Sequence, residues 1–182
     1  MTAGVGSLGL YALLTQPPLR RERPRWRDLV VGLGSAAALY GIFQVGDRVA
    51  RRILPSGARE IDDIYQLRTA APRPRIATAL AIVIGPGEEL FWHGLVQRSL
   101  QPRFGRVGAA LVTSGIYGGI HVVSENLTLT GAAGVAGLFW SLLYAREQRL
   151  PGLIISHVAW DIWIFLIAPT VPSPPIVGGA SA

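Results

Sequence analysis

The chain contains no cysteine and no lysine. The first absence excludes a disulfide scaffold, thiolate metal sites and a cysteine nucleophile, and the second excludes a lysine base or Schiff base. Charged residues are also scarce, at 15% of 182 residues, whereas half of the residues are apolar. A typical soluble domain has more charge than this, so the composition predicts a membrane protein.

The apolar residues lie in long blocks, and a membrane-spanning helix needs about 20 such residues. Five blocks are long enough, or nearly so, and run approximately over 28–47, 76–97, 107–123, 127–145 and 151–168. A shorter block at 5–14 is interpreted as the stub of a first helix. The predicted fold class is therefore all-α, a polytopic transmembrane helix bundle with about six membrane helices in a single domain, 1–182. The tail 169–182, rich in proline and glycine, is expected to be disordered.

The positions of the arginines indicate the partners and the orientation of the chain. They lie in the gaps between apolar blocks, where lipid headgroups are near, so membrane lipids are the expected partner and nucleic acid is not. With the amino terminus outside, the inside loops would be 20–27, 98–106 and 146–149, which are rich in arginine as cytoplasmic loops are. The segment 48–75 opposes this rule with seven arginines. Within it, Ile61, Ile64 and Tyr65 have helical spacing, and this face could lie flat on a membrane surface.

Six charged or chargeable residues, three histidines and three carboxylates, lie inside the apolar blocks, where each charge costs about 2.5 to 3.5 kcal/mol on insertion scales. We therefore expect them to meet in the interior of the bundle. Residues four apart share a helix face, and this spacing relates three pairs on three helices. A cavity formed by these faces could hold a water and a polarised carbonyl. Pro86, between two glycines, is expected to kink its helix just before the carboxylates. The pairs are Glu89 with His93, Tyr117 with His121, and His157 with Asp161, and Glu88 precedes the first.

These residues resemble the three signature segments of the CPBP family, the CAAX protease and bacteriocin-processing (Abi) membrane proteins related to the type II CAAX prenyl endopeptidase. The family's Glu-Glu-x-x-x-Arg segment is matched by EELFWHG, with His93 in the place of the arginine. Its aromatic-x-x-x-His segment is matched by YGGIH, and its His-x-x-x-Asn/Asp segment by HVAWD. The resemblance covers a core at about 76–168.

The resemblance implies a multi-pass protein of the cell membrane that hydrolyses a peptide bond in a protein or peptide substrate, prenylated or otherwise membrane-anchored. The chain without lysine and cysteine suggests a bacterial source. The resemblance also implies that Glu88 activates a water, while Glu89 orients it or pairs with His93. His121 would assist the water or stabilise the oxyanion, and His157, held by Asp161, would complete the polarising pocket. Tyr117 and His93 would support the site.

Three alternatives remain at this stage. His121, His157 and Glu88, with His93 as a further candidate, also form a plausible zinc ligand set, whereas the glutamate-based version needs no cofactor. A catalytically degenerate member would be a membrane scaffold or a bacteriocin-immunity factor, an idea that the histidine at position 93 motivates. A small transporter or proton relay would be expected to contain paired repeats with interrupted helices, which the sequence does not show.

Overall fold

The apolar blocks of the sequence form helices, and the computed structural model describes residues 2–170 of the chain. Within that range the structure contains helices and no strand. Four helical segments, Trp26–Ile53, Arg73–Ser124, Leu127–Glu147 and Leu150–Ile167, are long and apolar enough to cross a membrane. The predicted all-α polytopic bundle is confirmed, while the number of crossings stays a prediction. Most of the predicted tail, residues 171–182, lies outside the described residues. The α-helices are α1 (Thr2–Thr15), α2 (Trp26–Ile53), α3 (Gly57–Gln66), α4 (Arg73–Ala79), α5 (Gly85–Glu89), α6 (Arg98–Ile120), α7 (Leu127–Glu147) and α8 (Leu150–Ile162).

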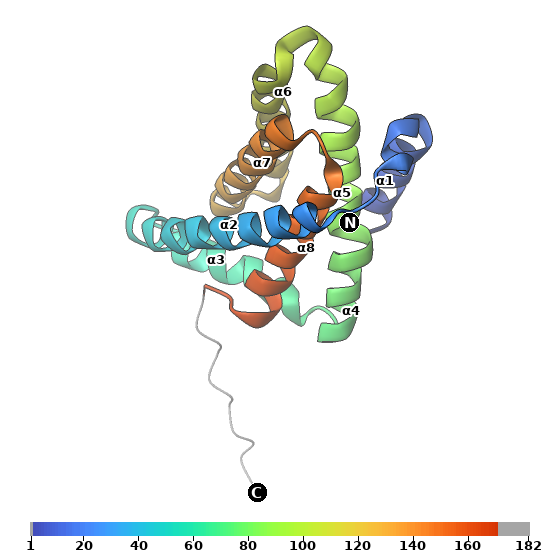
Figure 1. Ribbon diagram of the computed structural model, residues 1–182. Helices are drawn as coiled ribbons and strands as arrows, with labels where there is room; N and C mark the ends of the chain where they lie inside the picture. Colours follow the sequence, from blue (N-terminus) through green and yellow to red (C-terminus); the bar gives the residue numbers. More distant parts are fainter. Residues whose placement is uncertain (1, 171–182) are drawn as a thin grey trace, which may run out of the picture.

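The longest of these segments, Arg73–Ser124, is a helical hairpin. Gly105 inside α6 has φ 68° and ψ 177°, a backbone conformation that favours glycine. Pro102 lies three residues before it, at a position where proline disturbs helical hydrogen bonding. The chain therefore reverses at Gly105 and forms two arms, 73–104 and 106–120, as Figure 1 shows where α6 turns back at the end of the bundle.

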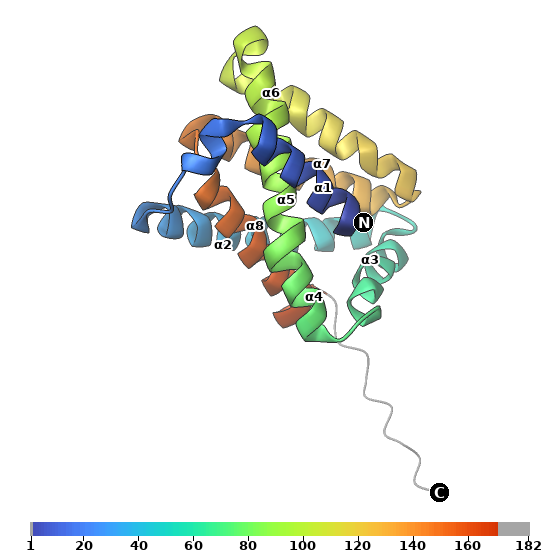
Figure 2. The ribbon, with the colours of Figure 1, turned by 90° about the vertical axis from the view of Figure 1, so that its right-hand side faces the viewer.

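The first arm of the hairpin is irregular around Pro86. Wide π-helical turns, Leu80–Ile84 and Leu90–Gln97, lie on both sides of the short α5. Proline has no backbone N–H to donate to the preceding turn, and π-helical turns are frequent at functional sites. The disturbance expected at Pro86 therefore takes the form of widened turns, and Figure 2 shows α4, α5 and the start of α6 as one continuous column.

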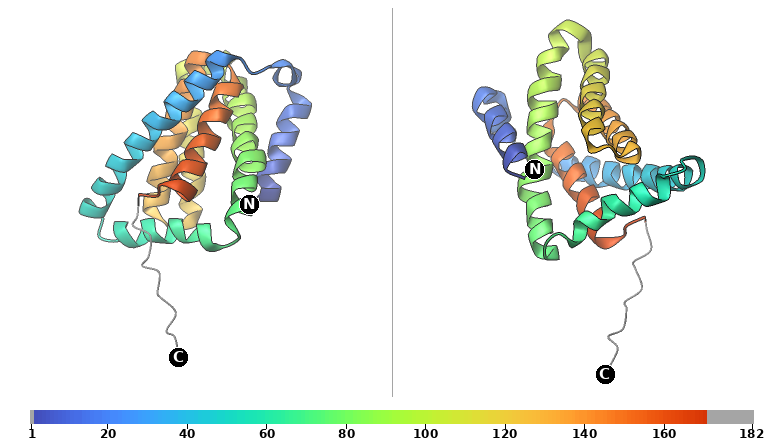
Figure 3. Two further views of the ribbon diagram at one scale, coloured as in Figure 1. Left: turned by 60° about the horizontal axis from the view of Figure 1, so that its bottom comes forward. Right: turned by 180° about the vertical axis from the view of Figure 1, so that it is seen from behind.

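Small residues allow the helices to approach one another closely. A Cβ added at Gly32 of α2 would lie 2.6 Å from Ile155 Cγ2 of α8, and these two helices pack along each other. A Cβ added at Gly9 of α1 would lie 2.7 Å from the Cα of Gly87 in α5. Helix α1 thus lies against the outer side of the first arm, as both views of Figure 3 show. Such contacts are typical of membrane helices, where close packing replaces the hydrophobic driving force.

Helix α3 crosses one end of the bundle between α2 and α4 (Figure 3, left). Its apolar face points inward, because Ile61 and Tyr65 are only 5% and 7% exposed and belong to a core with Trp140 and Trp160. The sequence suggested that this face could lie on a membrane surface. In the structure, protein covers it at Ile61 and Tyr65 instead.

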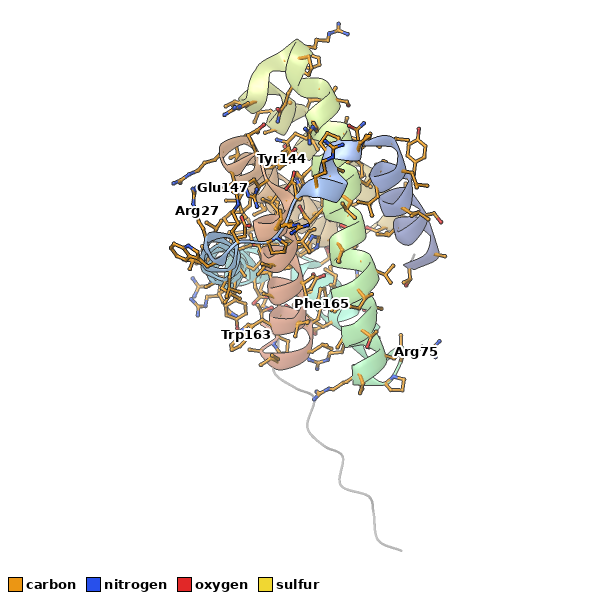
Figure 4. All side chains as sticks on the ribbon, turned by 45° about the vertical axis from the view of Figure 1, so that its right-hand side comes forward. Arg27, Arg75, Tyr144, Glu147, Trp163 and Phe165 are labelled. Atoms are coloured by element: carbon orange, nitrogen blue, oxygen red, sulfur yellow. The ribbon has the colours of Figure 1, made fainter. Side chains whose placement is uncertain are left out.

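Polar contacts join two loop regions at one end of the bundle. Arg149 Nη2 lies 2.9 Å from Asp28 Oδ2, and Arg27 Nη2 lies 3.0 Å from Glu147 Oε2. Figure 4 shows Arg27 beside Glu147, far from Arg75 at the other end. The arginine-rich segments 20–27 and 146–149, predicted to share a side of the membrane, therefore lie at one end of the bundle. Which end faces the cytoplasm stays a prediction.

Candidate active site

Glu89 is at the centre of a buried polar cluster. Its side chain is 1% exposed, and its two carboxylate oxygens contact two different imidazoles. The Nδ1 atom of His157 lies 2.8 Å from Glu89 Oε1, and the Nδ1 atom of His93 lies 2.7 Å from Glu89 Oε2. The first and third sequence motifs therefore meet at this carboxylate, 68 positions apart in the chain.

Two glycines of the GPGEE stretch make this meeting possible. A Cβ on Gly85 would lie 2.8 Å from Val158 Cγ2, next to His157 on α8. A Cβ on Gly87 would lie 2.9 Å from Val5 Cγ1 on α1. Because no real Cβ occupies such positions without a shift of its neighbours, glycine lets α5 touch α8 on one side and α1 on the other.

Glu88 is half-buried and is held by the second motif. Tyr117 Oη donates a hydrogen bond of 2.7 Å to Glu88 Oε2. The Tyr117 ring lies over Gly137 of α7, where an added Cβ would be 2.7 Å from Tyr117 Cδ1, and meets Trp92 edge to face at 5.3 Å. The two arms of the hairpin and α7 together fix the position of this phenol.

His121 is the first residue of the 3₁₀ turn that follows α6. Its Nδ1 atom lies 2.8 Å from the carbonyl oxygen of Tyr117. Since a carbonyl only accepts, Nδ1 donates in this contact, and Nε2 is the ring nitrogen available to a ligand. The second motif therefore holds its histidine by a local backbone contact.

The ring of His157 is fixed by aromatic stacking as well as by Glu89. Trp140 stacks on it with ring centroids 4.0 Å apart and 20° between the planes. Trp140 Nε1 in turn donates to Ser156 Oγ at 3.1 Å. Asp161 Oδ2 lies 3.6 Å from His157 Nε2, farther than Glu89 is from Nδ1. The hydrogen-bond partner of His157 is thus Glu89, while Asp161 is an ion-pair neighbour.

His93, in the place of the family's arginine, is 4% exposed. Its Nδ1 atom faces Glu89, and its Nε2 atom lies 3.3 Å from Ser141 Oγ. Sequence reasoning missed Trp140, Ser141 and Gly137, although Gly137 and Ser141 are four residues apart on α7. That spacing was a usable signal, although glycine and serine are also common in membrane helices simply for close packing.

The arrangement does not fit the zinc ligand set considered above. Among the described residues 2–170, no group of three histidine, aspartate or glutamate side chains is arranged to hold a metal ion. His93 and His157 both direct Nδ1 at Glu89, and the other nitrogen of His93 is near a serine hydroxyl. We therefore derive no chemical step through a metal.

The cluster forms part of the wall of a large cavity, the main cavity, with a volume of about 560 Å³. Glu88, Tyr117, His121, His157 and Asp161 line it together with many apolar side chains of α2, α3, α7 and α8. A carboxylate and imidazoles beside an apolar cavity are the groups that general acid–base chemistry requires.

The fold and the site together define a polytopic α-helical membrane protein with a buried carboxylate–imidazole cluster. The family model described as type II CAAX prenyl endopeptidase Rce1-like matches residues 72–163, about half of the chain and all three motifs, and the chain belongs to this family. The resemblance predicted from the motifs is thereby confirmed, and the family supports a CAAX-type intramembrane endopeptidase in general. Neither the curated proteins nor the solved structures gave a significant match.

Proposed function

We propose that the chain is an intramembrane endopeptidase in which Glu88 is the general base. The observation that carries this proposal is the place of Glu88, which lines the main cavity while Tyr117 holds one of its oxygens at 2.7 Å. The second oxygen is the one that we assign to the attacking water. Family membership supports the reaction class, peptide-bond hydrolysis, but not these roles.

In the proposed reaction Glu88 removes a proton from the water as its oxygen attacks the scissile carbonyl carbon. The imidazoles of His121 and His157 are assigned to the developing oxyanion in their doubly protonated form, because Nδ1 of each already donates and only an imidazolium can also donate from Nε2. Preorganised donors of this kind contribute most to catalysis. Glu88 then gives its proton to the leaving amine. Glu89 holds His157 and His93 in place and does not touch the substrate.

The main cavity supports a substrate that carries a lipid group. Its volume lies within the range of about 300 to 1,000 Å³ that is usual for ligand pockets. Its walls include Phe43, Ile61, Trp160 and Phe165, which would stabilise an apolar chain by removing it from water. A prenylated or otherwise membrane-anchored protein or peptide is therefore the proposed substrate class.

The test compares wild type with Glu88→Gln, which keeps the shape of the side chain and removes the base. A quenched fluorescent peptide with a farnesylated cysteine is presented to the purified protein in liposomes, and peptide termini are compared by mass spectrometry in membranes that contain each variant. The expected loss of rate is about 100- to 10,000-fold, the usual contribution of a general base.

Glu125→Gln is the matched control, because Glu125 is exposed in the turn between α6 and α7. It should cleave as wild type does. Cleavage by wild type and Glu88→Gln at equal rates would remove Glu88 from the role of base. No cleavage by either protein, together with equal termini, would instead assign the chain to the non-catalytic class, a membrane scaffold or immunity factor.

A further inference from the structure

A second, much smaller cavity lies behind the two glutamates. Its volume is about 10 Å³, and side chains from four helices line it, among them Glu88, Glu89, Thr113 and Ser141. A volume of about 10 to 15 Å³ measured in this way is what one water molecule needs. The space is therefore of the right size for a single water and too small for a substrate group.

Thr113 of α6 lines this small cavity, and the hydrogen bonding of its hydroxyl is unusual. Its side chain is 0% exposed, yet its Oγ1 has no hydrogen-bond partner among the described residues. A threonine in a helix ordinarily bonds to the carbonyl of the preceding turn, as Thr130 of α7 does to Asn126 at 3.0 Å. A buried hydroxyl without a partner is costly, so Thr113 requires an explanation.

We propose that the small cavity binds one water molecule, which accepts from the Thr113 hydroxyl and donates to the carboxylates of Glu88 and Glu89. This water has three polar partners, the usual number for a buried water. It differs from the hydrolytic water, which enters through the main cavity. It ties α6 to both carboxylates and, together with Tyr117, fixes the orientation of Glu88.

Thr113 is thus a positioning residue that acts through the bound water, and this catalytic consequence rests on the proposed function. The water site itself does not, because it follows from the cavity and the hydroxyl alone. Two measurements separate the two claims.

The first measurement is thermal unfolding of the purified protein in detergent, which needs no substrate. Thr113→Val keeps the shape of the side chain but removes the hydroxyl, and we expect its Tm to fall by about 2 to 4 °C, as for one lost buried hydrogen bond in a chain of this size. Thr113→Ser keeps the hydroxyl and should restore most of the loss. The same or a higher Tm for Thr113→Val would overturn the water site, because removing a lone hydroxyl from a dry cavity relieves a cost.

Thr130→Val is the matched control, since it removes a threonine hydroxyl that bonds within its own helix. For Thr130→Val we do not expect a loss of Tm and of cleavage rate that Thr130→Ser then restores. If Thr113 and Thr130 respond alike, the effect belongs to threonine in a helix, and the water site is overturned.

The second measurement is cleavage of the farnesylated peptide in liposomes. We expect kcat of Thr113→Val to fall about 5- to 10-fold with KM unchanged, and Thr113→Ser to return kcat to near the wild-type value, because a mispositioned base slows the chemical step without changing substrate binding. A wild-type kcat for Thr113→Val would overturn the positioning role while the unfolding result still decides the water site. Absence of cleavage by wild type would count against the proposed function alone.

Discussion

At the scale of single residues, the structure gives Tyr117 a more definite place than the sequence did. The spacing of Tyr117 and His121 predicted a shared helix face, and both do line the main cavity. The contact of the phenol with Glu88 could not be read from the sequence, because it joins positions 29 apart on two different helices. Helical spacing predicts neighbours within one helix and says nothing about which partner lies opposite.

Tyr117→Phe should slow cleavage without unfolding the protein. A hydrogen bond to a charged group is worth about 1.5 to 3 kcal/mol, and each 1.4 kcal/mol is about tenfold in rate. We therefore expect kcat to fall by about 10- to 100-fold, measured with the farnesylated peptide in liposomes.

Tyr11→Phe is the control for Tyr117→Phe, because Tyr11 lies on α1 and is 57% exposed. Its kcat should equal that of wild type. Equal rates for the two variants would show that the phenol of Tyr117 has no part in the function of Glu88.

His157 illustrates the same limit of sequence reasoning. Helical spacing predicted its neighbour on its own helix but not its closer partner on another helix. The four-residue spacing joined it to Asp161, and the structure does place the two 3.6 Å apart. The shorter contact, however, is with Glu89 at 2.8 Å, from a helix much earlier in the chain. The set of polar residues was thus predictable from their cost in an apolar block, whereas their pairing depends on how the helices cross.

At the scale of helices, the boundaries follow hydropathy closely. The blocks predicted at 127–145 and 151–168 correspond to α7, Leu127–Glu147, and to the helical segment Leu150–Ile167. The position of α3 could not be predicted from hydropathy. An amphipathic helix with apolar residues at Ile61 and Tyr65 is equally suited to a membrane surface and to a protein core. Only the partner helix decides between the two.

Gly137→Ala should displace Tyr117 and impair the site through α7. The added Cβ would lie 2.7 Å from Tyr117 Cδ1, closer than real contacts allow, so the ring must shift from the position in which its hydroxyl bonds to Glu88. We expect kcat to fall by at least the factor seen for Tyr117→Phe, measured in the same liposome assay.

Gly134→Ala, one turn earlier in α7, is the control for Gly137→Ala. A Cβ at Gly134 would meet nothing within 4 Å. Because alanine is favoured over glycine in a helix by about 0.5 to 1 kcal/mol, the Tm of this variant should rise or stay constant with kcat unchanged. A similar loss of activity in both variants would mean that flexibility of α7, and not the Tyr117 ring, is what matters.

Helix α3 is fastened to the start of α7 by Glu60, and this contact should depend on pH. Glu60 Oε2 accepts from the backbone N and the hydroxyl of Thr128 at 2.8 and 2.7 Å, and Glu60 Oε1 accepts from Ser56. These hydrogen bonds, that of the Thr128 hydroxyl foremost, hold the pKa of Glu60 below its ordinary value. A carboxylate at a helix N-terminus also interacts favourably with the helix dipole.

Because its pKa is lowered in the folded state, Glu60 stabilises the protein above its unfolded-state pKa of about 4.3. This stabilisation is lost as the pH falls through the folded-state pKa. We therefore expect wild type to have a higher Tm than Glu60→Gln at neutral pH, and the difference to disappear in acid below that pKa. Glu125→Gln should show no such pH-dependent difference, and a constant difference for Glu60→Gln at all pH values would contradict the role of the charge.

At the scale of the whole molecule, the absence of cysteine makes the membrane orientation directly measurable. Single cysteines can be placed at two exposed serines: Ser99, on the first arm of the hairpin close to its turn at Gly105, and Ser124, just after the second arm at the opposite end. With the amino terminus outside, Ser124→Cys should react with an impermeant maleimide in intact cells and Ser99→Cys only after lysis, since the arginine-rich 98–106 turn is expected inside. The reverse labelling pattern would assign the cytoplasmic side to the end that carries α3.

The hairpin at Gly105 also determines the order in which the site is completed during synthesis. Glu88 and Tyr117 lie on its two arms, so this carboxylate and the phenol that donates to it can meet as soon as both arms have left the ribosome. His157 is made 68 residues after Glu89 and arrives with the last apolar segment. Until then Glu89 has only His93 as an imidazole partner, and the nascent chain carries half of the site. Under the proposed function, cleavage therefore requires insertion of the final helix.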